Sequence, residues 1–322
     1  MRRARRLAAG LLAGMVVSAA CDELRTADDD AGRLAIATGD TSGVYYVLGG
    51  GYAQVITDHL TGYRATAEAT GASVENIKRV VSGQSDIAFT LADTATDAVR
   101  GESSFTSPQP IRALARIYSS YVHVIVRADA GINRIEDMRG KTVSTGSPNS
   151  GTEVIAQRLL KVAGLDADRD IKRQRLTLPE TTAGMQSGAI QALFWSGSRP
   201  TAGIKSLFAP AKGKIKFLDL SPYVARMQSD FTPLYTQASI GRNVYGTDAD
   251  IPTISVPNLL VVRDTMSEAL ATKLVALLFD YKDDLVKVNP EAKNIDIKTA
   301  QETGEVVLHN GAKRYYTDHR TG

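Results

Sequence analysis

Short apolar runs and helical patterns alternate along the chain, separated by turns of small and polar residues. Residues 34–37 form an apolar strand candidate, and residues 44–60 have the apolar face of a helix. An extended segment at 63–70, a helix at 73–81 and a strand at 86–91 follow. Strand, turn and helix repeat at the spacing that is typical of a parallel sheet. This pattern predicts an α/β fold.

A second series of elements begins after two extended stretches, 111–118 and 122–126. The pattern predicts strands at 141–145, 192–195 and 215–218, and helices at 150–163 and 181–188. An apolar extended run at 253–262 and the longest predicted helix, 267–288, complete the chain. We expect a first α/β domain of residues 33–120 and 250–322, a second of residues 121–249, and a cleft between them where the strands end.

The first 21 residues have the order of a secretory signal. Four arginines precede an apolar run at 7–17, and small residues then lead to Cys21, the only cysteine. The run is shorter than the roughly 20 residues that span a bilayer as a helix. The small residues before Cys21 resemble the lipobox of bacterial lipoproteins, and the alternative is a chance cysteine near an ordinary cleavage site. We expect a signal peptide at 1–21, lipidation at Cys21 and a flexible tether at 22–32.

The charge balance argues against a nucleic-acid partner. The chain has 38 Lys plus Arg and 35 Asp plus Glu, but four of the arginines precede Cys21 and every acidic residue follows it. Residues 22–322 therefore carry 34 positive and 35 negative charges, a net charge of −1. Phosphate contacts need clustered Lys and Arg, and no dense basic stretch exists. We expect no nucleic-acid binding.

Two loops join a predicted strand to a predicted helix and have the residues of an anion site. Residues 38–43 (TGDTSG) place glycines where backbone N–H groups can point outward, and residues 145–152 (TGSPNSGT) add hydroxyl groups at the start of the next helix. A helix N-terminus with free N–H groups favours an anion such as a carboxylate. A plain turn between strand and helix remains the alternative for the first loop.

Signals of catalysis are weak. The four histidines, His59, His123, His309 and His319, lack the spacing of metal ligands, and no serine lies in a G-x-S-x-G motif. The first loop also lacks the G-x-G-x-x-G pattern of a dinucleotide site. We expect no enzymatic activity, no cofactor and no metal.

Several motifs in order along the chain resemble one family. Residues 37–46 (ATGDTSGVYY), with Leu48 and Gly49 after them, resemble the T-G-G-T-G-G-V-Y-Y-P-L-G opening of the TAXI family of extracytoplasmic solute receptors, which serve TRAP-type secondary transporters. Further resemblance lies at residues 67–76, 82–89, 146–153, 194–200 and 308–316. It spans essentially residues 33–318.

This resemblance implies an α/β protein with a two-domain, periplasmic-binding-protein-like fold of type II, a hinge and an inter-domain cleft that closes on its ligand. It implies a small carboxylate or amino acid as ligand, such as glutamate, glutamine or 2-oxoglutarate, and a TRAP membrane permease as partner. We expect an extracytoplasmic monomer that is anchored to the cell membrane through its N-terminal lipid. By position in the motifs, the implied ligand-binding residues are Thr41, Ser42, Gly43, Tyr45, Tyr46, Ser73, Asn76, Asp93, Ser147, Ser150, Gly151, Thr152, Trp195 and Ser196.

Three positions depart from the family pattern. Asp40 stands where glycine is usual, Val47 replaces proline, and Ser198-Arg199 follow Gly197 where a second glycine is usual. Asp40 would repel a carboxylate or accept an ammonium group, and Arg199 would supply a compensating cation. The sequence leaves the ligand open. It also leaves two other functions open, a substrate-binding lipoprotein of an ABC importer and a ligand-sensing accessory protein.

Overall fold

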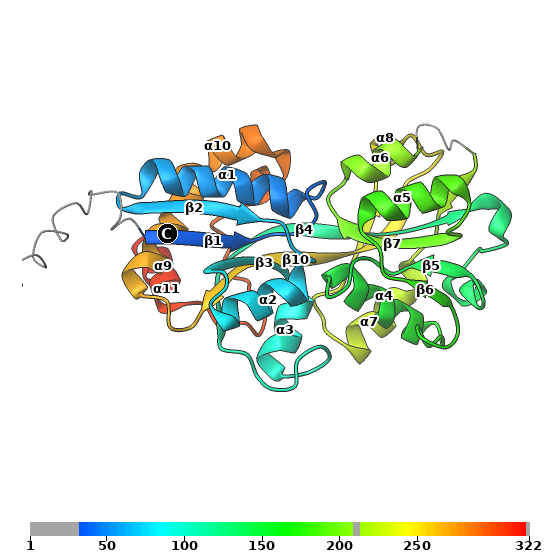
Figure 1. The fold of residues 1–322 in the computed structure, drawn as a ribbon, viewed down its shortest axis with the longest axis horizontal. Helices are drawn as coiled ribbons and strands as arrows, with labels where there is room; N and C mark the ends of the chain where they lie inside the picture. Colours follow the sequence, from blue (N-terminus) through cyan, green and yellow to red (C-terminus); the bar gives the residue numbers. More distant parts are fainter. Residues whose placement is uncertain (1–31, 209–212, 320–322) are drawn as a thin grey trace, which may run out of the picture.

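A single mixed sheet runs through the whole molecule (Figure 1). The computed structural model describes residues 32–208 and 213–319, so the predicted signal, Cys21 and all of the tether except Gly32 lie outside it. The strand order is β2-β1-β3-β10-β4-β7-β5-β6, with β8 paired to β4 and β9 paired to β10. The strands are β1 (Gly32–Ala37), β2 (Tyr63–Glu68), β3 (Ile87–Leu91), β4 (Ile111–Arg127), β5 (Thr142–Ser144), β6 (Lys172–Gln174), β7 (Ala192–Gly197), β8 (Ile215–Phe217), β9 (Thr236–Ile240) and β10 (Ile251–Arg263).

Eleven helices cover the sheet within the described part of the chain, and four short 3₁₀ helices connect elements. The α-helices are α1 (Val44–His59), α2 (Ser73–Ser82), α3 (Ala92–Arg100), α4 (Gly151–Val162), α5 (Leu178–Ser187), α6 (Ala202–Phe208), α7 (Val224–Asp230), α8 (Arg242–Tyr245), α9 (Glu268–Asp280), α10 (Lys282–Val288) and α11 (Asn310–Asp318). No described helix is both long enough and apolar enough to cross a membrane.

Two long antiparallel strands, β4 and β10, extend through both halves of the sheet (Figure 1). The first half contains β1, β2 and β3, which pair in parallel with one another. The second half contains β5, β6 and β7, also parallel. The pairing of β4 changes from β10 to β7 at Tyr121, and β10 passes from β9 to β3 between Ser255 and Asn258. The halves therefore meet at the middle of these two strands.

The strands β3 and β10 lie in the middle of the sheet, and they are the most completely buried ones. Every residue of β3 is buried, and so are Val256 to Val262 in β10. A strand that is covered on both faces reads as a continuous apolar run, which is the pattern that predicted both elements. By contrast, no residue of β2, at one edge of the sheet, is fully buried.

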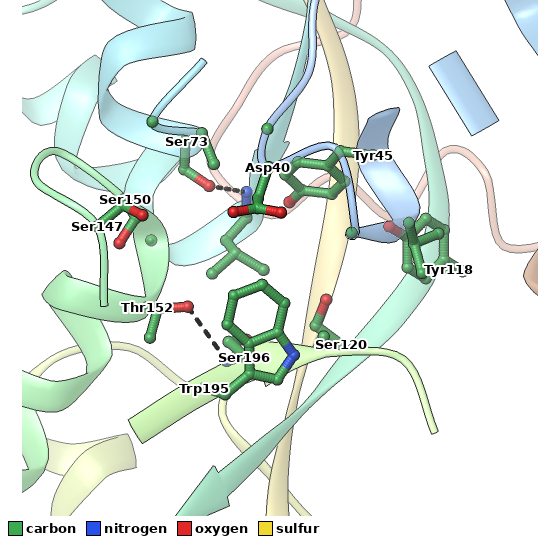
Figure 2. A pocket seen from close by; sticks show the side chains of 18 residues that line it. Asp40, Tyr45, Ser73, Tyr118, Ser120, Ser147, Ser150, Thr152, Trp195 and Ser196 are labelled. Carbon is green, nitrogen blue, oxygen red and sulfur yellow. Dashed lines mark hydrogen bonds between the residues drawn. The ribbon is translucent and has the colours of Figure 1, made fainter. Parts of the chain in front are cut away.

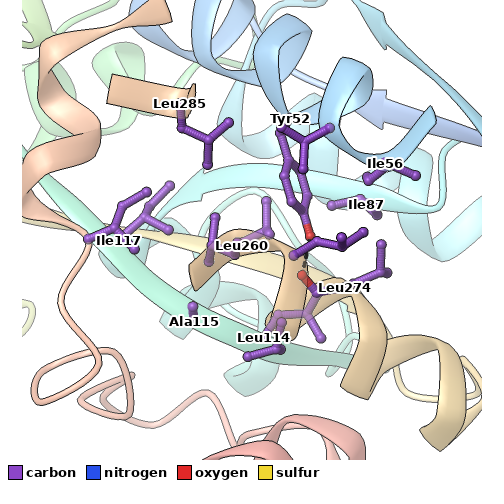
Figure 3. Close-up of a cluster of buried hydrophobic side chains, with 14 of the residues drawn as sticks. Tyr52, Ile56, Ile87, Leu114, Ala115, Ile117, Leu260, Leu274 and Leu285 are labelled. Atoms are coloured by element: carbon purple, nitrogen blue, oxygen red, sulfur yellow. Dashed lines mark hydrogen bonds between the residues drawn. The ribbon is translucent and has the colours of Figure 1, made fainter. Parts of the chain in front are cut away.

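The core of the first half lies between the sheet and the helices α1 and α9 (Figure 3). Ile56, Leu114 and Leu260 are among its buried side chains. Tyr52 is fully buried there, and its hydroxyl donates a 2.6 Å hydrogen bond to the carbonyl oxygen of Leu274 in α9. This bond joins α1 to α9 across 222 residues of sequence.

The structure corrects two of the predicted elements. Residues 111–118 and 122–126 form one strand, β4, because Ser119, Ser120 and Tyr121 continue the ladder with β10. The predicted helix at 267–288 is two helices, because α9 ends before Tyr281 and α10 begins after it. The sequence pattern also did not predict α3, α6, α7, α8 and α11, or the strands β6 and β9.

Candidate ligand-binding site

A cavity opens between the two halves of the sheet, and residues of both halves line it (Figure 2). The volume open to the centre of a water molecule is about 60 Å³. Since one water needs roughly 10–15 Å³ of such space, the cavity holds about four to six waters. A molecule that fits this space is therefore small. The lining residues are Gly39, Asp40, Gly43, Val44, Tyr45, Gly71, Ala72, Ser73, Leu91, Tyr118, Ser120, Ser147, Ser150, Gly151, Thr152, Trp195, Ser196 and Gly197.

Three helices begin at this cavity. The first residues of α1, α2 and α4 are Val44, Ser73 and Gly151, and all three line it. Each of these helices follows a loop at the carboxyl end of a parallel strand, which is where open α/β sheets bind ligands. Their dipoles bring partial positive charge to the same space. The two loops that the sequence predicted as anion sites therefore meet, although they are about 100 residues apart.

Free backbone donors remain at two of these helix starts. The N–H groups of Val44 and Tyr45 in α1, and of Gly151 and Thr152 in α4, have no hydrogen-bond acceptor among the described residues. The first N–H groups of a helix have no partner within the helix and can bind an anion. The site can thus hold a carboxylate without a cationic side chain.

Some hydroxyl groups of the cavity already have hydrogen-bond partners within the protein, and one does not. Ser73 Oγ accepts a bond from the Leu91 amide at 3.1 Å, and Ser150 Oγ caps α4 by accepting from the Glu153 amide at 3.0 Å. Ser196 Oγ is buried and has no hydrogen-bond partner in the part of the chain that the structure describes. A buried hydroxyl without a partner costs free energy, so a polar ligand atom at this position would be stabilising.

Aromatic rings form part of the wall. Burial raises the pKa of the Tyr45 phenol, which stays protonated and donates a 2.6 Å bond to Asn258 Oδ1 on β10. Burial likewise raises the pKa of Tyr118, whose ring centroid lies 6.5 Å from that of Tyr45. Trp195 Nε1 donates to Thr201 Oγ1 at 3.0 Å, so its indole is held in place and its ring remains available for an apolar part of a ligand.

The two halves contact each other beside the cavity. The carbonyl oxygen of Asn149, in the second half, accepts bonds from the amides of Val74 and Glu75 at the start of α2, at 3.1 and 3.2 Å. Gly151 packs so tightly against the first half that a Cβ atom there would lie 2.4 Å from Leu91 Cδ1 and 2.7 Å from Ser73 Oγ. Glycine is required where elements approach this closely.

Most of the predicted ligand-binding residues lie at the cavity. Nine of the 14 line it: Gly43, Tyr45, Ser73, Ser147, Ser150, Gly151, Thr152, Trp195 and Ser196. Their roles as ligand contacts remain predictions. Sequence reasoning did not include Tyr118 and Ser120, which lie in β4 at and just before the polar interruption where the halves meet. That interruption in an apolar stretch was the available signal.

Five predicted residues do not line the cavity. Thr41 is exposed, and Ser42 donates its hydroxyl to Asp40 Oδ1 at 2.5 Å. Tyr46 follows Tyr45 in α1, and successive side chains of a helix point about 100° apart. The other two, Asn76 and Asp93, are fully buried.

Asn76 and Asp93 have structural partners instead. Asn76 Nδ2 donates to the carbonyl oxygens of Thr38 and Phe89 at 2.5 and 2.8 Å, which ties the residue after β1 to the middle of β3. Asp93 Oδ2 lies 3.3 Å from Arg158 Nη1 in α4. Both side chains are therefore used by the protein itself.

Arg199 does not provide a cation to the cavity. It is exposed, its guanidinium lies 3.9 Å from the centroid of the Tyr121 ring, and Nη1 donates to the Ser239 carbonyl. The expected compensation of Asp40 by Arg199 is absent from this arrangement. Within residues 32–208 and 213–319, no group of three or more His, Cys, Asp and Glu side chains could hold a metal ion.

The fold and the position of the cavity define a class, the α/β proteins with the fold of periplasmic binding proteins. A family model described as the NMT1-like family matches residues 36–319. The chain belongs to the NMT1-like family.

Solved structures share this fold at low sequence identity. One is the binding protein component of an ABC phosphonate transporter from Pseudomonas aeruginosa, with a TM-score of 0.57 and 15% identity over 83% of this chain and 80% of that one. A Xanthomonas citri protein bound to ATP has a TM-score of 0.54 and 13% identity over 89% and 94% of the two chains. An ancestral arginine-binding protein bound to arginine has a TM-score of 0.50 and 14% identity over 81% and 97%.

Proposed function

We propose that this protein is the extracytoplasmic solute receptor of a TRAP-type secondary transporter, of the TAXI type, and that it captures a small carboxylate or amino acid. The observation that carries the proposal is the cavity itself. Its lining comes from both halves of one sheet and includes the first residues of α1 and α4, whose amides have no hydrogen-bond partner among the described residues. Such a site binds a small anion without performing chemistry on it.

We further propose that the halves are two domains, residues 33–120 with 250–322 and residues 121–249, that close on the ligand. The strands β4 and β10 connect them and serve as the hinge. Contacts such as that of Asn149 with the start of α2 then belong to the closed state. The TAXI assignment and the permease partner rest on the motifs described above, which cover essentially residues 33–318.

A substrate-binding lipoprotein of an ABC importer is the second candidate. Its support is the similarity to the binding protein component of an ABC phosphonate transporter. The two candidates predict different dependence of uptake on energy. Uptake that stops when the ion gradient is collapsed, with ATP maintained, supports the TRAP assignment, and uptake that stops only on ATP depletion supports the ABC importer.

A thermal-shift screen tests solute binding directly. A ligand at 100 times its Kd adds about 2.7 kcal/mol of stability, which for a chain of this size raises Tm by about 5 °C. Trp195 is the only tryptophan and lines the cavity, so its fluorescence provides a second readout. If no small carboxylate or amino acid changes either signal, the proposed function is wrong.

The membrane anchor has its own test. Cys21 lies outside the described residues, and its lipidation stays a prediction from the sequence. We expect Cys21→Ala to release the protein from membranes, since acylation is the proposed attachment. Membrane association that is unchanged in this variant would contradict the anchor and leave solute binding untouched.

A further inference from the structure

The cavity carries a negative charge. Among its 18 lining residues, Asp40 is the only one with a carboxylate, and burial keeps the phenols of Tyr45 and Tyr118 protonated. No Lys, Arg or His belongs to the lining. In Figure 2, the Asp40 carboxylate lies between the serines of the second half and the ring of Tyr45, above the ring of Trp195.

One oxygen of this carboxylate remains available. Asp40 Oδ1 accepts the Ser42 amide at 2.8 Å and the Ser42 hydroxyl at 2.5 Å. Among the described residues, no donor bonds Oδ2 and no cation pairs with Asp40. A half-buried carboxylate without a cation is unfavourable, since burial weakens its solvation. A positively charged ligand group would remove this cost.

The turn itself does not need the charge. An Asn side chain forms the same turn through its Oδ1 atom. Asp219 makes the equivalent contacts on the surface, where its Oδ1 accepts the Ser221 amide at 2.8 Å and the Ser221 hydroxyl at 2.6 Å. Asp219 is exposed and does not line the cavity. It is therefore a matched control for the structural role of Asp40.

We propose that the ligand carries a protonated amine as well as a carboxylate, and that Asp40 is the residue that selects for the amine. The free amides at the starts of α1 and α4 hold the carboxylate, and Asp40 Oδ2 accepts from the ammonium group. A ligand with two carboxylates and no amine would bring like charge to Asp40. This inference rests on the proposed function, because it names the substrate class of the same site.

Matched pairs of compounds test the amine requirement by isothermal titration calorimetry. L-Glutamate is compared with glutarate, and L-glutamine with glutaramate, so that each pair differs only by the α-amino group. We expect the amine-bearing members to bind at least about 10-fold more tightly, the change expected for one hydrogen bond between charged groups. The same titrations are run with all other common L-amino acids.

Variants then test the residue. We expect Asp40→Asn to weaken amine binding by roughly 10- to 100-fold and to reduce the preference over the desamino partner, while Asp219→Asn changes neither. Circular dichroism and Tm check that both variants fold. If Asp40→Asn does not fold, Asp40→Gly, with the residue usual in the TAXI pattern, takes its place.

The outcomes separate the two proposals. Equal or tighter binding of the desamino acids, or an Asp40→Asn variant that keeps the amine preference, overturns the inference and leaves the receptor function standing. A panel in which nothing binds overturns the receptor function, and the inference with it. Amine-selective binding that Asp40→Asn abolishes and Asp219→Asn retains supports both.

Discussion

A buried cluster of charged side chains joins α3 in the first half to α4 in the second. Its disruption is expected to lower the stability of the protein. Arg158 in α4 donates to both oxygens of Asp97 at 2.5 Å, and its Nη1 lies 3.3 Å from Asp93 Oδ2 in α3. Nη1 also donates to the Tyr235 hydroxyl at 2.9 Å. The side chains of Arg158, Asp93 and Asp97 are only 9%, 0% and 8% exposed. Arg158 is therefore the cation for two buried carboxylates.

We expect Arg158→Met to lower the free energy of unfolding by about 3–5 kcal/mol at pH 7, because it removes the cation that two buried carboxylates share. Burial already raises the pKa of Asp97, although Arg158 opposes this effect. Without Arg158, the pKa of the Asp97 carboxyl rises further above its unfolded value. The folded variant then binds more protons than the unfolded chain, so its deficit should shrink as the pH falls from 7 to 5.

Urea unfolding followed by circular dichroism at pH 7 and pH 5 measures this effect. Arg116→Met is the control, because Arg116 pairs with Glu302 at 2.7 Å on the surface, where such a pair contributes at most about 1 kcal/mol. Changing Asp93 and Asp97 to Asn together with Arg158→Met should recover much of the loss, since no buried charge remains. A cost for Arg158→Met no larger than for Arg116→Met would refute this reasoning.

Three further changes have distinct expected results. Gly151→Ala should weaken ligand binding by about 10-fold in calorimetry, because its Cβ would force the halves apart. Gly50→Ala is the control, because a Cβ there would meet open space. Equal Kd values for the two variants would contradict the close contact at Gly151. Burial lowers the pKa of His123 to about 4. Because the unfolded chain takes up this proton at a higher pH than the folded protein, the free energy of unfolding should fall by up to about 3 kcal/mol as the pH drops from 6.5 to 4. His123→Gln should flatten that decline in urea titrations. An unchanged slope in the variant would show that another group controls the pH dependence. Tyr52→Phe removes the bond to the Leu274 carbonyl and should cost about 1–2 kcal/mol of unfolding free energy, whereas a loss below 0.5 kcal/mol, on the order of a surface change, would argue against that bond.

Local patterns predicted the elements that build the site. The strand at 34–37 and the helix at 44–60 correspond to β1 and α1, with boundaries that differ by one or two residues. Apolar periodicity and the glycines of the two loops are local properties, so they could be read directly. The mixed fold and the position of the cavity follow from how these units pair in one sheet.

Long-range partners explain what the sequence could not predict. Asp93 follows a predicted strand as a ligand-binding residue would, but its partner Arg158 lies 65 residues further along the chain. Arg199 is close in sequence to Trp195, yet the ring of Tyr121 and the carbonyl of Ser239 hold it outside the cavity. Side-chain direction at these positions depends on contacts that no local pattern contains.

The first turn of α2 is held in place by the carbonyl oxygen of Asn149, which belongs to the other half. The residue before this helix, Ala72, provides no side-chain cap, and the amides of Val74 and Glu75 bond instead to a loop of the other half. Any motion that separates the halves leaves these two amides to solvent, and the first helical turn then frays. Hydrogen exchange at Val74 and Glu75 would thus report how often the halves separate, without a label and without a ligand.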